Sequence, residues 1–185
     1  MKLSIPNLLA LLRVIAVPIV MVLIHNDEWS AAAVVFTFAA VTDFFDGFIA
    51  RRMNDTTTFG AFLDLVADKL LTVGTLLALL ASSRVSLIIA FAIIGREMTL
   101  ISLRSVTAGK GVDIKASDFG KAKAWVQFIA IGTVLIRGDT MWGPLFPDEW
   151  AMGIAAVWTV ASGIEYIWRF RHVLAEDTPQ LGENI

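Results

Sequence analysis

Four aspartates stand close together in a part of the chain that is otherwise almost entirely apolar. Asp43 and Asp46 are three residues apart, and Asp64 and Asp68 are four apart, so on helices each pair shares one face. An ionised carboxylate at membrane depth is costly unless a positive charge compensates it. All-oxygen ligand sets suit Mg²⁺ or Mn²⁺. The spacing therefore predicts two divalent cations, a pair able to stabilise attacking and leaving oxygens in a phosphoryl displacement.

Small residues and one arginine accompany the aspartates. Gly47 and Ala50 leave a strip of helix without bulky side chains, and Gly60 does the same one turn before Asp64. Arg51 could pair with a phosphate or with the carboxylates themselves. A purely structural alternative exists, because buried Asp–Arg pairs and Gly/Ala spacing also occur where membrane helices pack together. Four aspartates beside a single arginine disfavour that alternative.

A second group of charged residues lies further along the chain and is cationic. Its members are Arg96, Arg104, Lys121 and Lys123. Arginine binds phosphate through a planar fork and lysine through a point charge, so the group predicts a clamp for a phosphorylated substrate. Arg13 either joins this clamp or neutralises the aspartates. Two alternatives stay open, in which Lys123 contacts lipid headgroups and Glu97 pairs with Arg96 only to hold the helices together.

The composition indicates a membrane protein. Hydrophobic residues make up 57% of the chain and charged residues 17%, whereas soluble domains average about 25% charged residues. The six tryptophans fit the same class, since Trp gathers where lipid meets water. The chain has no cysteine, which excludes disulfides and thiolate metal sites, and its two histidines leave little scope for an imidazole site.

Six apolar segments are long enough to cross a bilayer, which takes about 20 residues each. They are 5–24, 30–50, 61–82, 85–105, 119–137 and 150–170. The connections between them are short and polar. We therefore expect an all-α, polytopic membrane protein: a six-transmembrane-helix bundle forming one domain over residues 1–174, followed by a flexible acidic tail over residues 175–185.

The placement of lysine and arginine predicts the orientation of this bundle. Positive residues mark cytoplasmic loops. The N-terminus, the second and fourth connections and the tail carry Lys2, Arg51, Arg52, Lys110, Lys115, Lys121, Lys123, Arg169 and Arg171. The other side carries only Arg84 and Arg137. Both termini should therefore be cytoplasmic, and the aspartates should lie at the cytoplasmic end of the bundle.

The aspartate segment matches a known signature, D-x2-D-G-x2-A-R-x8-G-x3-D-x3-D, running from Asp43 to Asp68. On this pattern the chain resembles the CDP-alcohol phosphotransferase family. Further motifs resemble the branch that uses CDP-diacylglycerol and glycerol 3-phosphate, among them Ile5-Pro6-Asn7, Gly95-Arg96-Glu97 and Gly120-Lys121-Ala-Lys123. The similarity extends over roughly residues 4 to 130, and the last segment and tail add nothing specific to it.

The resemblance implies a reaction and a role for each matching residue. A phosphatidyl group would pass from CDP-diacylglycerol to glycerol 3-phosphate, releasing CMP. Asp43, Asp46, Asp64 and Asp68 would hold two cations, Mg²⁺ or Mn²⁺, and Asp68 would also be the general base. The CDP-lipid site would comprise Asn7, Gly47, Ala50, Arg51, Thr57 and Gly60. The acceptor phosphate would meet Arg96, Arg104, Lys121, Lys123 and Arg13.

The resemblance also implies a setting for the protein. We expect a homodimer in a bacterial cytoplasmic (inner) membrane, with the active site facing the cytoplasm and no nucleic-acid partner. Two alternatives remain. Another acceptor would make the chain a cardiolipin, serine or inositol-phosphate type of the same family. A divalent-cation transporter would also place carboxylates in a membrane, although it requires access to them from both sides.

Overall fold

The computed structural model describes the backbone of residues 5–53, 58–109, 118–137 and 141–175. Within these ranges the chain forms six α-helices and no strand, apart from one isolated bridge between Trp142 and Leu145. The helices are α1 (Ile5–His25), α2 (Trp29–Met53), α3 (Thr58–Ala81), α4 (Leu87–Gly109), α5 (Asp118–Leu135) and α6 (Pro147–Ala175). The predicted all-α class is confirmed, and each predicted segment coincides with one helix.

Polar turn residues explain where several helices begin and end. Asp27 and Ser83 have positive φ angles, 61° and 57°, in the turns that follow α1 and α3. A residue in this left-handed conformation commonly terminates a helix. At the start of α6, the Phe146 N–H donates to the Glu149 carboxylate at 2.8 Å, which satisfies an amide that the first turn leaves unpaired. These local signals delimit the long apolar helices.

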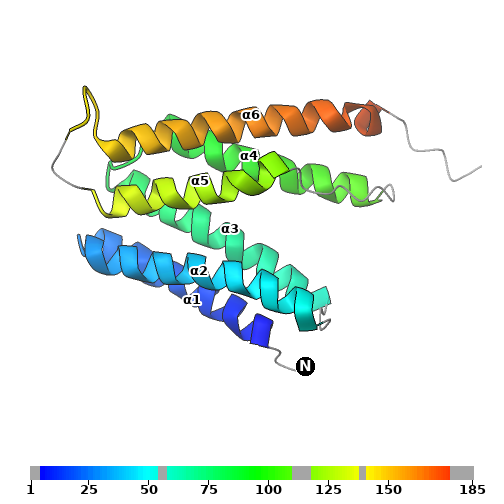
Figure 1. Ribbon diagram of the computed structural model, residues 1–185, viewed down its shortest axis with the longest axis horizontal. Coiled ribbons are helices and arrows are strands. Elements are labelled where there is room, and N and C mark those ends of the chain that lie inside the picture. Colours follow the sequence, from blue (N-terminus) through cyan, green and yellow to red (C-terminus); the bar gives the residue numbers. More distant parts are fainter. Residues whose placement is uncertain (1–4, 54–57, 110–117, 138–140, 176–185) are drawn as a thin grey trace, which may run out of the picture.

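The helices form two groups that meet along the middle of the molecule (Figure 1). In one group α1 packs against α2 and α3, and in the other α6 packs against α4 and α5. The groups touch where α2 meets α5 and where α3 meets α4 and α5. Figure 1 also shows the end of α2 and the start of α3 at the same end of the molecule. The two backbone stretches that carry the four aspartates therefore lie at one end of the bundle.

Close helix contact requires a small residue at one point in the first group. A Cβ atom added to Gly74 of α3 would lie 2.5 Å from Cγ1 of Val17 on α1, too close for any side chain. The surrounding core consists of fully buried aliphatic residues, including Val20, Leu71 and Leu79. Gly74 therefore lets α1 and α3 approach, which also sets the distance between the charged residues further along both helices.

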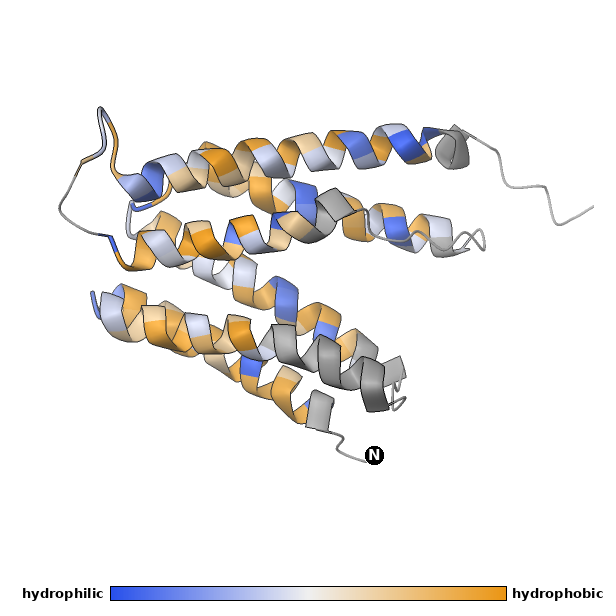
Figure 2. Cartoon of the chain, in the orientation of Figure 1, coloured by the Kyte–Doolittle hydropathy of each residue, from blue (hydrophilic) through white to orange (hydrophobic). Residues whose placement is uncertain are grey.

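Apolar side chains cover much of the outer surface (Figure 2). Ile88, Phe91 and Val157 are 81%, 75% and 70% exposed, and many other large apolar residues are also exposed. Patches of this kind mark surfaces that contact lipid or a protein partner. Two helical stretches, Asn7–His25 and Pro147–Arg171, are long and apolar enough to cross a membrane. These features are consistent with a membrane protein.

The other predicted spans differ from these two in their charge. Asp64, Asp68 and Lys69 interrupt the apolar sequence of α3, and Arg96, Glu97 and Arg104 interrupt that of α4. Shorter apolar stretches remain in α2, over Trp29–Thr42, and in α5, over Ala122–Leu135. Most candidate site residues therefore lie on α2, α3, α4 and α5, and Asn7 and Arg13 lie on α1.

Candidate active site

Asp64 and Asp68 lie one turn apart on α3, as the sequence predicted. Arg13 of α1 donates from Nη1 to Oδ1 of Asp64 at 3.2 Å. The Arg13 side chain is completely buried between helices, whereas 57% of the Asp64 side chain is exposed. Burial without compensation would be costly for the guanidinium, and Asp64 supplies the countercharge. Of the two roles open to Arg13, the contact favours neutralisation of the aspartate cluster.

Asp68 is linked to α4 through its neighbour Lys69. The Lys69 Nζ lies 2.6 Å from Oδ2 of Asp68 and 2.9 Å from Oε2 of Glu97. Lys69 therefore bridges one carboxylate on α3 and one on α4. The bridge brings Asp68 next to the cationic residues of the second helix group.

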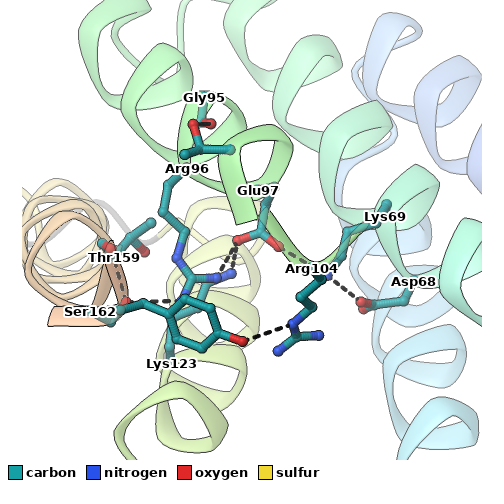
Figure 3. A network of polar contacts seen from close by, with 11 residues as sticks. Asp68, Lys69, Gly95, Arg96, Glu97, Arg104, Lys123, Thr159 and Ser162 are labelled. Atoms are coloured by element: carbon teal, nitrogen blue, oxygen red, sulfur yellow. Dashed lines mark hydrogen bonds and ion pairs between the residues drawn. The ribbon is translucent and has the colours of Figure 1, made fainter. Parts of the chain in front are cut away.

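Glu97 is the centre of the cationic group (Figure 3). Its Oε1 accepts a hydrogen bond from Arg96 Nη1 at 3.1 Å and another from Lys123 Nζ of α5. Glu97 is 3% exposed and Lys123 is 5% exposed. Three cations from three helices thus share one buried carboxylate. Lys123 therefore pairs with a carboxylate inside the bundle, and its contact with an acceptor phosphate or with a lipid headgroup stays a prediction.

In the network formed by the described residues, three cations meet two carboxylates. Glu97 and Asp68 are the carboxylates of the network, while Lys69, Arg96 and Lys123 are its cations. Arg104 adds a further cation about two turns after Glu97 on α4. Its Nε donates to the Tyr166 hydroxyl at 3.3 Å. Lys123 is buried, Lys69 and Arg96 are partly buried and Arg104 is exposed, and an excess of cations at such a site is compensated by an anion or by water. The arrangement therefore favours an anionic ligand such as a phosphate group.

The residues predicted for the CDP-lipid site are described only in part. Asn7 is 7% exposed on α1, and Gly60 lies in the first turn of α3. The backbone of α2 includes Asp43, Asp46, Gly47, Ala50 and Arg51, whose side chains lie outside the described part of the structure, as does the Lys121 side chain on α5. Thr57 also lies outside the described residues. The convergence of all four aspartates stays a prediction.

The two described aspartates fit a hard divalent cation. Their carboxylates are oxygen donors one helical turn apart, and each attracts a positive side chain, Arg13 or Lys69. A Mg²⁺ or Mn²⁺ ion would compensate the negative charge of these carboxylates in the same way. Among the side chains that the structure describes, no three potential ligands cluster together. A complete ligand set would therefore need Asp43 and Asp46 of α2.

Sequence reasoning did not assign a role to three residues that hold this site together, Lys69, Ser162 and Tyr166. It named Glu97 only as a structural partner of Arg96, and the structure shows that Glu97 also pairs with Lys69 and Lys123. A lysine and a glutamate in the middle of apolar helices were a usable signal, since such residues are rarely tolerated without a partner. A serine and a tyrosine on an apolar helix gave no comparable signal, because both are common there.

The chain belongs to the CDP-alcohol phosphatidyltransferase family, whose family model matches residues 3–162, and it is therefore a transferase. The resemblance seen in the aspartate signature is thus confirmed, over most of the chain.

Relatives that carry a more specific name are similar over almost their full length. One from Escherichia coli is 40% identical, covering 90% of this chain and 94% of the relative. One from Sodalis glossinidius is 39% identical, covering 95% and 100%. One from Bacillus subtilis is 34% identical, covering 88% and 93%. Each of the three is named CDP-diacylglycerol–glycerol-3-phosphate 3-phosphatidyltransferase.

Proposed function

We propose that this chain transfers the phosphatidyl group of CDP-diacylglycerol to glycerol 3-phosphate, giving phosphatidylglycerophosphate and CMP. The observation that carries the proposal is the similarity, over nearly full length, to relatives with that name. The intact aspartate signature from Asp43 to Asp68 supports it from the sequence. The buried cations around Glu97 support a phosphorylated acceptor rather than a neutral alcohol.

The family generally uses divalent metal ions, and the four aspartates would hold them. Asp64 and Asp68 supply oxygen donors from α3, and Asp43 and Asp46 would supply the others from α2. Two ions, Mg²⁺ or Mn²⁺, would offset the charge of the pyrophosphate and of the departing CMP. Arg13 orients the Asp64 carboxylate, because its buried guanidinium donates to Oδ1 of Asp64 at 3.2 Å.

Asp68 is the proposed general base. The acceptor hydroxyl attacks the phosphorus attached to diacylglycerol, and its proton passes to the Asp68 carboxylate as the new oxygen–phosphorus bond forms. The bond between that phosphorus and the bridging oxygen of the pyrophosphate breaks, and its electron pair leaves with CMP. Lys69 pairs with Asp68 and, through Glu97, connects this carboxylate to the proposed acceptor clamp.

Arg96, Arg104, Lys121 and Lys123 form the proposed clamp for the acceptor phosphate. Glu97 holds Arg96 and Lys123 close to Lys69, and hence close to Asp68. An acceptor phosphate bound there would present its hydroxyl to the base, which is the orientation that catalysis requires. Asn7, Gly47, Ala50, Arg51, Thr57 and Gly60 are the proposed CDP-lipid contacts.

The proposed setting is a bacterial cytoplasmic membrane crossed six times, with residues 1–174 as one domain, both termini cytoplasmic and a homodimeric assembly. The exposed apolar surface supports a lipid environment. A site at the membrane face lets acyl chains remain in lipid while glycerol 3-phosphate arrives from the cytoplasm. The acidic tail, residues 175–185, is proposed as a flexible extension.

Purified protein in detergent tests the proposal directly. The protein is incubated with CDP-diacylglycerol, Mg²⁺ or Mn²⁺, and a panel of acceptors: glycerol 3-phosphate, glycerol, serine, inositol phosphate and phosphatidylglycerol. CMP release is expected with glycerol 3-phosphate and not with the neutral alcohols. CMP release with another acceptor alone would overturn the acceptor assignment. Metal flux into proteoliposomes with no CMP release would favour a transporter.

A further inference from the structure

The last helix, α6, contacts both arginines of α4 through residues that the family motifs do not include. Arg96 Nη2 donates to the Ser162 hydroxyl at 3.2 Å. The Ser162 hydroxyl in turn donates to the Thr159 carbonyl at 2.9 Å, within α6 itself. Because this second bond fixes the hydroxyl proton, a lone pair of Oγ faces the arginine. Ser162 is 1% exposed and therefore cannot exchange this partner freely for water.

A glycine beside Ser162 leaves room for the stem of the same arginine. A Cβ atom added to Gly163 would lie 3.0 Å from Cγ of Arg96, closer than ordinary van der Waals contact. The Arg96 side chain therefore lies directly against the α6 backbone (Figure 3). Its Nε is buried without a hydrogen-bond partner among the described residues. An oxygen of a bound anion or a water would satisfy this donor.

Arg104 meets α6 one turn further along. Its Nε donates to the Tyr166 hydroxyl at 3.3 Å, and its Cζ lies 5.8 Å from the centre of the ring. Tyr166 is buried against Leu100, Leu103 and Phe170. The contact uses the Nε–H of the guanidinium and leaves the two terminal amino groups, which are the edge that binds a phosphate bidentately.

We propose that Ser162, Gly163 and Tyr166 form a positioning face on α6 that orients Arg96 and Arg104 for the acceptor phosphate. Ser162 and Tyr166 are four residues apart, so they lie on one side of the helix and each serves one arginine. The inference rests on the proposed function, since it assigns the arginines to the acceptor. It adds that α6 determines acceptor affinity while the CDP-lipid contacts come from α1, α2 and α3.

Steady-state kinetics of three variants test this face. Tyr166→Phe keeps the buried ring and removes the hydroxyl, Ser162→Ala removes the hydroxyl that accepts from Arg96, and Gly163→Ala pushes Arg96 away from α6. Each variant should raise the KM for glycerol 3-phosphate about fivefold to tenfold, which is within the range that the loss of one typical hydrogen bond converts to. The KM for CDP-diacylglycerol should change less than about twofold.

Matched controls lie on the same helices. Gly153→Ala makes the same change on α6, where an added Cβ meets nothing within 4 Å. Ser102→Ala removes an exposed α4 hydroxyl, whose one hydrogen bond among the described residues goes to the Met98 carbonyl of its own helix. Both controls should keep wild-type values of both KM constants.

Three outcomes would overturn the inference. In the first, the wild-type protein is active but the KM for glycerol 3-phosphate is unchanged in all three variants. That result rejects the positioning face and leaves the proposed function standing. In the second, both KM constants rise together, which shows a general structural role for these residues. In the third, the wild-type protein releases no CMP with glycerol 3-phosphate, and the proposed acceptor fails together with the inference.

Discussion

Asp68 has to serve two partners in the proposed reaction, a divalent cation and the acceptor hydroxyl. Its Oδ2 lies 2.6 Å from Lys69 Nζ, and Lys69 lies 2.9 Å from Glu97. The Lys69 ammonium can therefore move from Asp68 towards Glu97 when a metal ion approaches Asp68, and it keeps a carboxylate partner as it does so. This shared lysine connects the base to the acceptor clamp at the level of single atoms.

The Asp68→Asn substitution separates the two roles of this residue. The amide cannot accept the hydroxyl proton, so kcat should fall by roughly 10²- to 10⁴-fold, the range for loss of a general base. Binding of CDP-diacylglycerol should remain, because Asp43, Asp46 and Asp64 can still hold metal. Single-turnover rates and a CDP-lipid binding titration measure the two effects. Equal losses of binding and rate would show that Asp68 acts mainly as a metal ligand.

The Glu97→Gln substitution removes the negative charge that three cations share. Breaking a buried ion pair by removing one partner costs about 3–5 kcal/mol, since the remaining charge stays buried and unpaired. We therefore expect a clear drop in the midpoint of thermal unfolding in detergent micelles. Bound inorganic phosphate should restore part of that loss, because the freed cations gain an anionic partner.

Glu165→Gln is the matched control for this experiment. Glu165 pairs with Arg169 at 2.6 Å, one turn away on α6, where half of the arginine side chain is exposed. Exposed pairs of this kind contribute up to about 1 kcal/mol. A Glu97→Gln midpoint no lower than that of Glu165→Gln would mean that Glu97 is not the centre of a buried network.

At the scale of the helices, the packing of α1 on α3 determines how Arg13 meets Asp64. At Gly74 the α3 backbone lies against Val17 of α1, with no room for a Cβ atom, and Arg13 and Asp64 lie further along these helices. A displacement at Gly74 would therefore change the environment of a buried guanidinium. The contact between Gly74 and Val17 therefore affects both the stability of the fold and the position of Arg13 beside Asp64.

The Gly74→Ala substitution tests this contact. The new methyl group would overlap Val17, and overpacking of this kind typically costs about 1–3 kcal/mol. The unfolding midpoint should fall, and activity should fall with it. Gly132→Ala is the control, because an added Cβ at that α5 position meets nothing within 4 Å. A Gly74→Ala protein as stable as this control would show that the helices separate without cost.

Helix positions were predictable from the sequence, and the partners of charged residues were not. Long apolar segments with polar turns such as Asn26-Asp27 and Ser82-Ser83 give local information, and every predicted segment coincides with a helix. The pairing of Arg13 with Asp64, and of Lys123 with Glu97, depends on which helices become neighbours. A single sequence does not specify that arrangement. The roles of Ser162 and Tyr166 depend on it entirely.

At the scale of the whole molecule, the outer surface is apolar and the interior of the second helix group is charged. Exposed residues such as Val34, Phe38 and Ile136 are 69%, 67% and 70% exposed, whereas Glu97 and Lys123 are almost completely buried. Large apolar side chains exposed in this number mark a surface that contacts lipid or a protein partner. Placing the molecule in a bilayer gives the apolar side chains an apolar environment, and the charged network then faces the interior of the bundle.

The orientation of the bundle can be tested with single cysteines, since the natural chain contains none. Asn26→Cys lies in the turn between α1 and α2, and Gly109→Cys lies at the end of α4; both positions are exposed. With both termini cytoplasmic, six spans place Asn26 outside and Gly109 inside. A membrane-impermeant maleimide added to intact cells should label only Asn26→Cys, and permeabilisation should add Gly109→Cys. Labelling of Gly109→Cys in intact cells would reverse the orientation and place the aspartates on the outer face, away from cytoplasmic glycerol 3-phosphate.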